Sequence, residues 1–363
     1  MKVVTIVGAR PQFIKAAAVS RSIQNVSKIN EVFVHTGQHF DDNMSAIFFD
    51  ELDIPRPNYN LGVCGGSHGE QTAKMLLKIE DLLLKEKPNL VMLYGDTNST
   101  LAGSLAAVKL HIPIAHVEAG LRSFNKKMPE EINRILTDHS SDILFTPTET
   151  AIKNLKNEGI TGNKVCHVGD VMLDSTLYYT QKAERESTIL SDLKISSRKF
   201  VLVTIHRAEN TDDLDKLNKI FNSLEMLAKR HILVLTLHPR TKKSLESLNY
   251  SFQNSNIKFI EPVGFLDMLM LEKHSKIIIT DSGGVQKEAY FQKVPCITVR
   301  DETEWIELIE NGWNFLANHE NLCDIFNQMD DVKFPETDTI YGNGNASDKI
   351  VRKLQHYYSS KSR

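Results

Sequence analysis

The segment Thr280-Asp-Ser-Gly-Gly-Val-Gln-Lys-Glu-Ala-Tyr290 carries the clearest structural signal in the chain. The β-branched run that leads into it, residues 277–280, predicts a buried parallel strand, and residues 285–292 predict a helix. Ser282, Gly283 and Gly284 lie between the two and predict a tight turn with little side-chain bulk. A strand, a glycine turn and a helix N-terminus together present unpaired N–H groups and a positive dipole end to an anion, commonly a phosphate.

Glu288 lies one turn into this predicted helix, within reach of a neutral polar group such as a ribose diol. The same residues also fit an ordinary βα turn that uses glycine for its backbone angles. For Ser-Gly-Gly alone, the ordinary turn is the better interpretation. It is weakened here because the turn comes late in a second α/β half, where a nucleotide site is expected.

Strand and helix patterns alternate along the whole chain, in two successive series. The first series predicts strands at residues 3–7, 31–35, 90–94, 112–117, 143–145 and 165–168, with helices at 10–23, 44–52, 71–85, 100–110 and 129–141. After a charged, helix-favouring connection at 181–192, the second predicts strands at 200–205, 232–237, 257–260, 277–280 and 296–299, with helices at 214–229 and 285–292.

This alternation predicts an α/β protein with two parallel sheets. We expect two Rossmann-like, doubly wound domains at residues 1–180 and 181–345, facing a cleft lined by polar strand ends. A final helix within residues 346–363 is expected to pack back on the first domain.

Composition excludes several classes of protein. Apolar residues make up 41% and charged residues 25% of 363, and a net charge of −3 provides no basic field for nucleic acid. The four cysteines, Cys64, Cys166, Cys296 and Cys323, are far apart, which argues against a zinc site or a disulfide framework. With no secretory signal and no apolar run approaching the roughly 20 residues that span a bilayer, a cytoplasmic protein is expected.

Candidate acids and bases follow the predicted strands. Asp96 comes after the strand at 90–94, Glu118 follows the strand at 112–117, and Glu130 opens a helix after Pro129. Carboxylates at the carboxyl edge of adjacent strands can converge on one ligand and act as acid and base. Asp96 and Glu130 also fit as helix N-caps or first-turn acids, whereas Glu118 precedes Ala-Gly and does not open a helix.

Candidate cations lie at corresponding positions. Arg10 and Lys15 flank the first βα turn, where a cation can hold a phosphate, although Lys15 also fits a solvated surface pair. His206 and His238 each follow a strand of the second half and can contact a phosphate or act as an acid. The G-x-G-x-x-G dinucleotide fingerprint is absent from the first turn.

Together these motifs closely resemble the non-hydrolysing UDP-N-acetylglucosamine 2-epimerase family. The resemblance runs in order from residue 1 to the last helix. It rests on Gly8-Ala-Arg-Pro with Lys15, Gly95-Asp-Thr-Asn-Ser-Thr, His116-Val-Glu-Ala-Gly-Leu-Arg122, Pro129-Glu-Glu-Ile-Asn-Arg134, His206-Arg-Ala-Glu-Asn, His238-Pro-Arg, Asp281-Ser-Gly-Gly-Val-Gln-Lys-Glu288 and Tyr341-Gly-Asn-Gly.

The resemblance implies a glycosyltransferase-B type fold, a UDP-sugar substrate, inversion at C2 without a redox cofactor or metal, and a homodimer. It assigns catalysis to Asp96, Glu118, Glu130 and His206. Substrate binding is assigned, from the resemblance and the turn positions, to Arg10, Lys15, His238, Ser282, Gly283, Gly284 and Glu288. The implied chemistry removes the C2 proton while UDP departs from C1, leaving a glycal to which UDP adds again.

Some positions depart from the family pattern. Phe40 and Ala208 replace arginines that resemble an allosteric site for a second UDP-N-acetylglucosamine, so such activation is not expected. Trp305 and Ile306 replace the usual Arg-Pro, which resembles the branch that acts on UDP-2,3-diacetamido-2,3-dideoxyglucuronate. The leading hypothesis is a UDP-N-acetylglucosamine 2-epimerase that supplies surface-polysaccharide precursors; the diacetamido branch, a glycosyltransferase, a hydrolysing epimerase and a silent nucleotide-sugar sensor are the alternatives.

Overall fold

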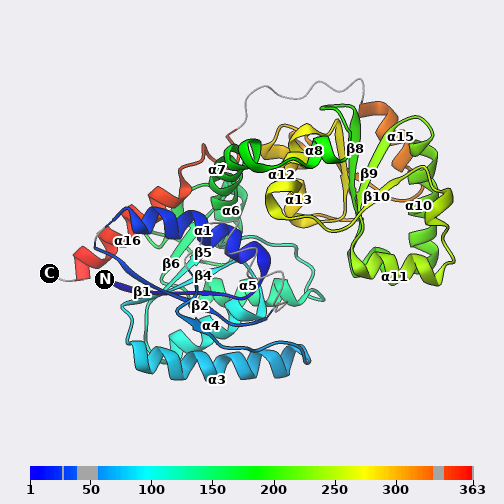
Figure 1. The fold of residues 1–363 in the computed structure, drawn as a ribbon. Coiled ribbons are helices and arrows are strands. Elements are labelled where there is room, and N and C mark those ends of the chain that lie inside the picture. Colours follow the sequence, from blue (N-terminus) through cyan, green and yellow to red (C-terminus); the bar gives the residue numbers. More distant parts are fainter. Residues whose placement is uncertain (27, 39–55, 330–338, 362–363) are drawn as a thin grey trace. The chain divides into compact units, whose positions relative to one another are not determined.

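The computed structural model describes residues 1–26, 28–38, 56–329 and 339–361. The chain divides into two compact units, unit 1 with Met1–Ser175 and Thr339–Arg363, and unit 2 with Thr176–Asp338. Each unit holds one sheet in which every strand pairing is parallel. The predicted α/β class and the two Rossmann-like domains are confirmed (Figure 1).

The sheet of unit 1 has seven strands in the order β3-β2-β1-β4-β5-β6-β7. The strands are β1 (Lys2–Val7), β2 (Asn30–His35), β3 (Tyr59–Asn60), β4 (Leu90–Tyr94), β5 (Ile114–Val117), β6 (Ile143–Thr146) and β7 (Val165–His167). The helices are α1 (Arg10–Gln24), α3 (His68–Glu86), α4 (Asn98–Lys109), α5 (Pro129–Ser140), α6 (Glu149–Asn157) and α16 (Ala346–Lys361), while α7 (Val171–Glu186) crosses the boundary.

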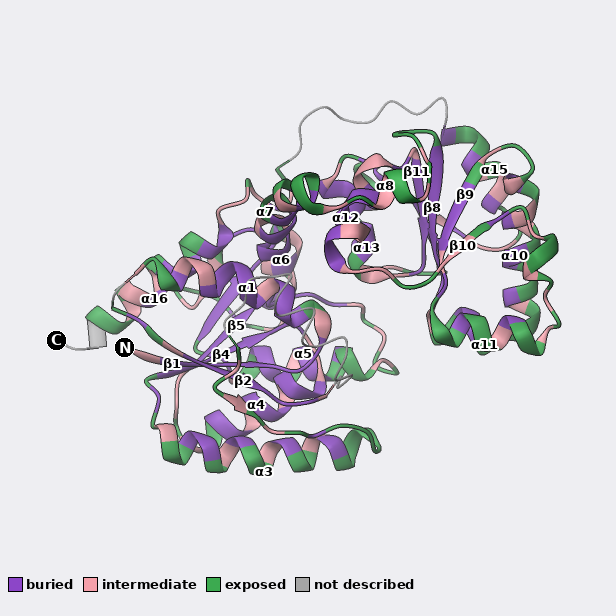
Figure 2. Ribbon diagram, in the orientation of Figure 1, coloured by how far each residue is buried: buried purple, intermediate pink, exposed green. Residues whose placement is uncertain are grey.

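Two helix layers bury the sheet of unit 1. Helix α4 packs between α3 and α5, and α1 packs against α16 (Figure 1). On the α3–α4 side, apolar side chains of β1, β2 and β4 form one cluster with Met75, Ile79 and Ala102, all fully buried. The strand runs are buried on both faces (Figure 2), which explains why they are continuously apolar rather than alternating.

The sheet of unit 2 has six strands in the order β10-β9-β8-β11-β12-β13. They are β8 (Phe200–Thr204), β9 (Ile232–Thr236), β10 (Lys258–Ile260), β11 (Ile277–Thr280), β12 (Cys296–Val299) and β13 (Asn314–Ala317). The helices are α8 (Ile189–Asp192), α9 (Ala208–Thr211), α10 (Leu214–Ala228), α11 (Pro239–Ser247), α12 (Phe265–His274), α13 (Gly283–Phe291), α14 (Ile306–Glu310) and α15 (Leu322–Gln328), with a 3-10 turn at Phe252–Asn254.

Both sheets change winding direction beside their first strand, between β1 and β4 in unit 1 and between β8 and β11 in unit 2. At such a switch point, the loops beyond the strands' carboxyl ends diverge and leave room for a ligand. The segments at these points begin at Gly8, Gly95, Ile205 and Asp281. Asp96 in unit 1 and His206 in unit 2 therefore lie next to a switch point, whereas Glu118 and His238 follow β5 and β9, one strand further along each sheet.

Two local expectations need comment. The predicted helix at 44–52 lies outside the described residues. The tight turn predicted at Ser282, Gly283 and Gly284 is wrong, because Ser282 is the N-cap and both glycines already belong to α13. In the described part of the chain, no helix is long and apolar enough to cross a membrane.

Candidate functional site

Asp96 follows β4 and is held by groups from α5. The N-cap of α4 is Thr97, whose side chain accepts a hydrogen bond from the Thr100 amide, so Asp96 is left for other contacts. Arg134 forms an ion pair with the half-buried Asp96 carboxylate, and Asn133 donates to the Asp96 main-chain oxygen at 2.9 Å. The ion pair and this hydrogen bond together hold Asp96 at the carboxyl end of β4.

Glu118 has a strained backbone and a charged partner. Its φ of 71° lies in the left-handed region, which costs a non-glycine residue roughly 1–2 kcal/mol. Two consecutive amides, those of Glu118 and Ala119, donate to the Phe145 carbonyl and hold the turn. The Glu118 side chain is buried and forms an ion pair with Lys15. Lys15 therefore pairs with a candidate acid inside unit 1 and is not a solvated surface cation.

Two adjacent glutamates at the start of α5 have different environments. Glu131 is 1% exposed, and it accepts hydrogen bonds from the Ser123 amide at 2.8 Å and the Phe124 amide at 2.9 Å. It also pairs with Arg134 at 3.0 Å, so its oxygens are committed to the fold. Glu130 is exposed in the first turn of the same helix, where a ligand can reach it. Glu130 is therefore the one of the two that is open to solvent, and its role as an acid stays a prediction.

Arg10 begins α1 directly after the first βα turn and is partly buried. The turn is fixed by Gln12, whose oxygen accepts from the Gly8 amide at 2.8 Å and the Ala9 amide at 3.1 Å. The Gln12 amide group donates to the Tyr94 carbonyl at 2.6 Å, which ties the turn to the end of β4. The first turn and the Asp96 segment are thus positioned by the same side chain.

In unit 2, the buried Asp281 organises the segment after β8. Its carboxylate accepts hydrogen bonds from the amides of His206 at 3.0 Å and Arg207 at 2.9 Å, and from Asn210 at 3.1 Å. These bonds fix the backbone from which the partly exposed His206 ring projects. Asp281 is 0% exposed, so it acts through the residues that it holds.

His206 and His238 lie side by side, with ring centroids 5.4 Å apart. Burial lowers the pKa of His206; Asp281 opposes this effect, and the charges of Arg207 and Arg240 reinforce it. Burial and the neighbouring His206 and Arg240 also lower the pKa of His238. Both rings therefore favour the neutral form in the free protein, and a bound anion would favour the charged form.

The N-terminus of α13 is closely packed on one side. A methyl group on Gly283 would lie 2.5 Å from Glu304 Oε1, so only glycine fits without movement of that carboxylate. Burial alone would raise the pKa of Glu304. The charges of Arg300 and Arg207 outweigh this effect, so the pKa is lowered overall. Trp305 donates from its indole to the Gly283 carbonyl at 2.9 Å. Gly284 is exposed in the first turn of α13, and amides in the first turn of a helix can bind an anion.

Glu288 lies on the same helix and is buried, with 7% of its surface exposed. A Cβ on Gly284 would lie 4.0 Å from Glu288 Oε2, so this carboxylate lies close to the first turn of α13. In the described ranges, no group of three or more His, Cys, Asp or Glu residues could hold a metal ion.

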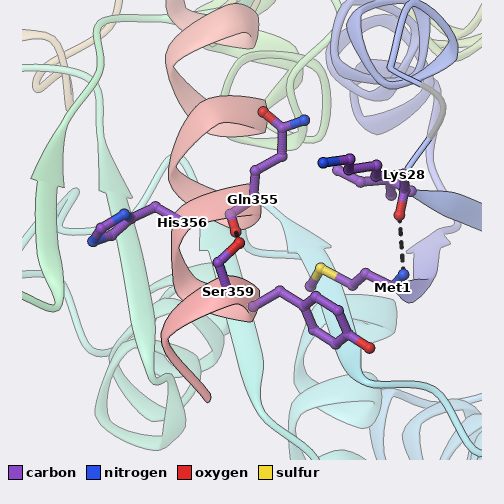
Figure 3. A pocket seen from close by; sticks show the side chains of 7 residues that line it. Met1, Lys28, Gln355, His356 and Ser359 are labelled. Carbon is purple, nitrogen blue, oxygen red and sulfur yellow. Dashed lines mark hydrogen bonds between the residues drawn. The ribbon is translucent and has the colours of Figure 1, made fainter. Parts of the chain in front are cut away.

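A hollow of about 260 Å³ lies elsewhere in unit 1, between the N-terminus and α16 (Figure 3). Met1, Lys28, His356 and Tyr358 are among its lining residues. None of the candidate acids lines it, and it is not the candidate site.

Reasoning from the sequence missed several residues that hold the candidates in place. Arg134 and Asp281 stood within recognised motifs but were not assigned roles, and Glu304 was not considered. The spacing of Glu131 and Arg134, three residues apart on one helix, was a usable signal for an ion pair. No local pattern indicates that Asp281 accepts amides from a segment about seventy residues earlier.

Comparisons with known proteins agree with these motifs. Residues 21–355 match the model of the UDP-N-acetylglucosamine 2-epimerase family. A UDP-N-acetylglucosamine 2-epimerase homolog of Methanococcus maripaludis is 54% identical over 365 residues, covering 98% of this chain and 100% of that protein. The UDP-2,3-diacetamido-2,3-dideoxy-D-glucuronate 2-epimerase of Pseudomonas aeruginosa is 51% identical over 360 residues, covering 98% and 99%.

The fold agrees as well. The crystal structure of Methanocaldococcus jannaschii UDP-GlcNAc 2-epimerase in complex with UDP-GlcNAc and UDP has a TM-score of 0.91 and 46% identity to this chain. The match covers 98% of this chain and 100% of that one. The chain therefore belongs to the UDP-N-acetylglucosamine 2-epimerase family and is an isomerase.

Proposed function

We propose that this protein is a non-hydrolysing UDP-N-acetylglucosamine 2-epimerase that interconverts UDP-N-acetylglucosamine and UDP-N-acetylmannosamine. One observation carries the proposal: Asp96 and Glu118 follow adjacent strands, β4 and β5, and each is paired with a cation. Carboxylates at the ends of neighbouring strands can remove a proton from one ligand and return it. The related Methanocaldococcus jannaschii enzyme binds UDP-GlcNAc and UDP in its crystal structure.

The proposed reaction avoids a free carbanion. The C2 proton is a poor acid, because no carbonyl is attached directly to C2. Removal of this proton while UDP departs from C1 forms a glycal, and reprotonation from the opposite face followed by UDP addition inverts the centre. Asp96, Glu118 and Glu130 are the proposed proton-transferring groups, placed so that carboxylates serve both faces of the sugar. Arg10 and Lys15 are the proposed cations of unit 1 that stabilise negative charge developing on UDP.

Unit 2 is proposed to bind the uridine diphosphate. The first-turn amides of Gly283 and Gly284 and the Ser282 hydroxyl are proposed to bind the diphosphate, and the helix dipole stabilises its charge; the Ser282 amide itself donates to Thr280 Oγ1 at 2.9 Å. His206 and His238 form a neighbouring pair whose protonation an anion would favour. Glu288 is proposed to accept hydrogen bonds from ribose hydroxyls.

A second substrate is favoured by one observation. The Pseudomonas aeruginosa relative, at 51% identity, is named for UDP-2,3-diacetamido-2,3-dideoxy-D-glucuronate. This chain has Trp305 where the family pattern has arginine, and the indole packs under Lys287, with Nζ 4.1 Å from the ring centroid. The alternative proposal is therefore 2-epimerisation of that sugar nucleotide by the same mechanism.

An experiment in deuterated water tests both proposals. The protein is incubated with each sugar nucleotide, without added nucleotide cofactor or metal, and C2 is followed by NMR. Deuterium at C2 together with the 2-epimer supports epimerisation, and the substrate that turns over is assigned. Accumulation of free UDP and free sugar would indicate hydrolysis and overturn the proposal. Asp96→Asn and Glu118→Gln are expected to keep UDP binding and lose turnover; full activity in both would refute the assigned acids.

We also propose that the protein is a cytoplasmic homodimer that supplies surface-polysaccharide precursors. Support for the dimer comes from large apolar side chains exposed on neighbouring helices α3, α4 and α5 of unit 1. These are Leu77 at 64%, Leu84 at 54%, Val108 at 36%, Ile132 at 46% and Leu136 at 46% exposure. A second copy of this chain is the proposed partner for this face.

Light scattering coupled to gel filtration measures the oligomeric state. The expected mass is that of two chains, falling to one chain in the variant Leu77→Asp with Ile132→Asp. Met226→Asp changes another exposed apolar residue, on α10 of unit 2, and is the matched control. A monomeric wild type, or a variant that stays dimeric, would refute the proposed interface.

A further inference from the structure

A buried charged network contacts the segments that carry Asp96 and Glu118, two of the three candidate acids of unit 1. Asp138 on α5 is 0% exposed and accepts three hydrogen bonds. The donors are His116 Nδ1 at 2.7 Å, the Gly120 amide at 3.0 Å and Arg122 Nη1 at 2.7 Å. Burial alone would raise the pKa of Asp138. The hydrogen bonds and charges of His116 and Arg122 together outweigh this effect, so the pKa is lowered overall.

The protonation of His116 follows from its partners. Its ring is fully buried, and its Nε2 lies 2.7 Å from the Gly95 carbonyl oxygen, which can only accept a hydrogen bond. Its Nδ1 faces the carboxylate of Asp138, which accepts when it is ionised. Nε2 therefore carries hydrogen, and Nδ1 and the Asp138 carboxyl group share one further hydrogen. Arg122 and Glu158, joined by two hydrogen bonds of 2.6 and 2.7 Å, complete the network.

This network joins the two segments that carry the acids. Gly95, whose carbonyl receives the His116 hydrogen bond, immediately precedes Asp96. Gly120, whose amide donates to Asp138, is two residues after Glu118 and closes the turn in which Glu118 has its strained φ of 71°. One side-chain pair thus bonds to the backbone on both sides of the candidate site.

We propose that His116 and Asp138 are positioning residues that set the placement of Asp96 and Glu118 relative to each other. The pair does not touch the substrate; it acts through the Gly95 carbonyl and the Gly120 amide. This inference rests on the proposed epimerase function for its kinetic consequence. Misplacing a reacting group by about 1 Å can reduce turnover on the order of 100-fold, which sets the expected scale.

Three conservative variants separate the hydrogen bond from His116 to Gly95 from the hydrogen bonds that Asp138 accepts. In His116→Asn, the amide nitrogen can replace Nδ1 toward Asp138 but cannot reach the Gly95 carbonyl. In His116→Gln, the longer amide can replace Nε2 toward Gly95 and loses Asp138. In Asp138→Asn, one oxygen and one NH2 group replace two acceptor oxygens, so three donors can no longer all be satisfied. Asp142→Asn is the matched control, because Asp142 accepts the Ile114 amide at 2.9 Å at the opposite end of β5.

Steady-state turnover of the full-length protein is the kinetic test. We expect kcat to fall roughly 10- to 100-fold in Asp138→Asn and His116→Asn. UDP affinity should stay within about twofold, because the proposed UDP groups lie in unit 2. The double variant Asp138→Asn with His116→Asn should lose little more than either single variant, because coupled residues act as one unit. A kcat within about twofold of the wild type in both single variants would overturn the proposal, as would an equal loss in Asp142→Asn.

A second measurement does not depend on activity. The ¹⁵N NMR spectrum of the wild type should show a His116 ring signal with hydrogen on Nε2 that exchanges slowly with solvent, and His116→Gln identifies this signal by its loss. A ring without hydrogen on Nε2 would overturn the inference even if the protein is active. If the wild type shows no epimerisation but Nε2 carries this hydrogen, the proposed function fails while the buried network stands. In that case, faster amide exchange at Gly120 in Asp138→Asn than in Asp142→Asn supports the positioning role, and equal exchange refutes it.

Discussion

Replacing Gly95 by alanine tests whether the placement of Glu118 controls turnover. Gly95 has a φ of 60°, and an added Cβ would lie 3.3 Å from Glu118 Oε2 and 3.5 Å from Lys15 Nζ. The first distance is shorter than an ordinary contact, so the carboxylate must move by a few tenths of an ångström. The substitution therefore displaces a candidate acid without removing any of its functional groups.

The structure also supplies the magnitudes. The left-handed backbone costs alanine roughly 1–2 kcal/mol, and the stiffer unfolded chain returns about 0.4–1 kcal/mol, so unfolding should become easier by about 1 kcal/mol. If a displacement of about 1 Å reduces turnover on the order of 100-fold, a few tenths of an ångström should reduce kcat about three- to tenfold. The Michaelis constant should change little, because UDP binding is assigned to unit 2.

Gly62→Ala is the matched control for this experiment. Gly62 also has a φ of 60° in unit 1, but an added Cβ has no heavy atom within 4 Å. Both variants should lose similar stability in urea titrations, whereas only Gly95→Ala should lose turnover in the deuterium-exchange assay. Equal kcat values in the two variants, after correction for the folded fraction, would refute the link between the position of Glu118 and catalysis.

Three further predictions concern protonation and packing. The pKa values of His206 and His238 are lowered in the free protein, and a bound diphosphate would raise them. The affinity of the Glu118→Gln variant for a UDP-sugar should therefore increase as the pH is lowered from about 7.5 to about 5.5. Calorimetry that shows no increase would refute this role of the two histidines. Burial lowers the pKa of His35 to about 4 in the folded protein. As the pH falls from about 7 to about 5, the unfolded chain is therefore protonated at His35 while the folded protein is not, and the free energy of unfolding should fall by about 2 kcal/mol. Urea unfolding of His35→Phe should show a smaller loss. Trp305→Phe removes the hydrogen bond to Gly283 and should destabilise unit 2 by about 1 kcal/mol, and an unchanged unfolding midpoint would contradict this contribution.

The sequence was sufficient for most strands, because these are short apolar runs separated by polar or glycine-containing segments. The predicted range 90–94 and the observed β4 coincide, as do 296–299 and β12. Helix α12 was missed because most of its residues are apolar and it is buried on several sides, which removes the helical periodicity. Strand β13 was missed because four residues at a sheet edge give too short a pattern.

The candidate acids could be predicted because chain connectivity alone puts them at the ends of parallel strands. Their individual environments could not. Glu130 and Glu131 are adjacent in sequence, yet one is exposed and the other accepts two amides from the loop before α5. The left-handed backbone of Glu118 likewise depends on the Phe145 carbonyl in a neighbouring strand.

In each unit, a buried aspartate accepts backbone amides of a segment next to the candidate residues, but it comes from a different kind of element in the two units. In unit 2 the buried aspartate, Asp281, directly follows a strand and holds the segment that carries His206. In unit 1 the buried aspartate, Asp138, comes from the last turns of a helix and reaches the end of β5 through Gly120. A carboxylate suits both positions because it accepts several N–H groups at once, and each hydrogen bond to a charged group contributes about 1.5–3 kcal/mol. Since the requirement is for an acceptor at a point in space, motif spacing reveals the residues that are held but not the aspartate that holds them.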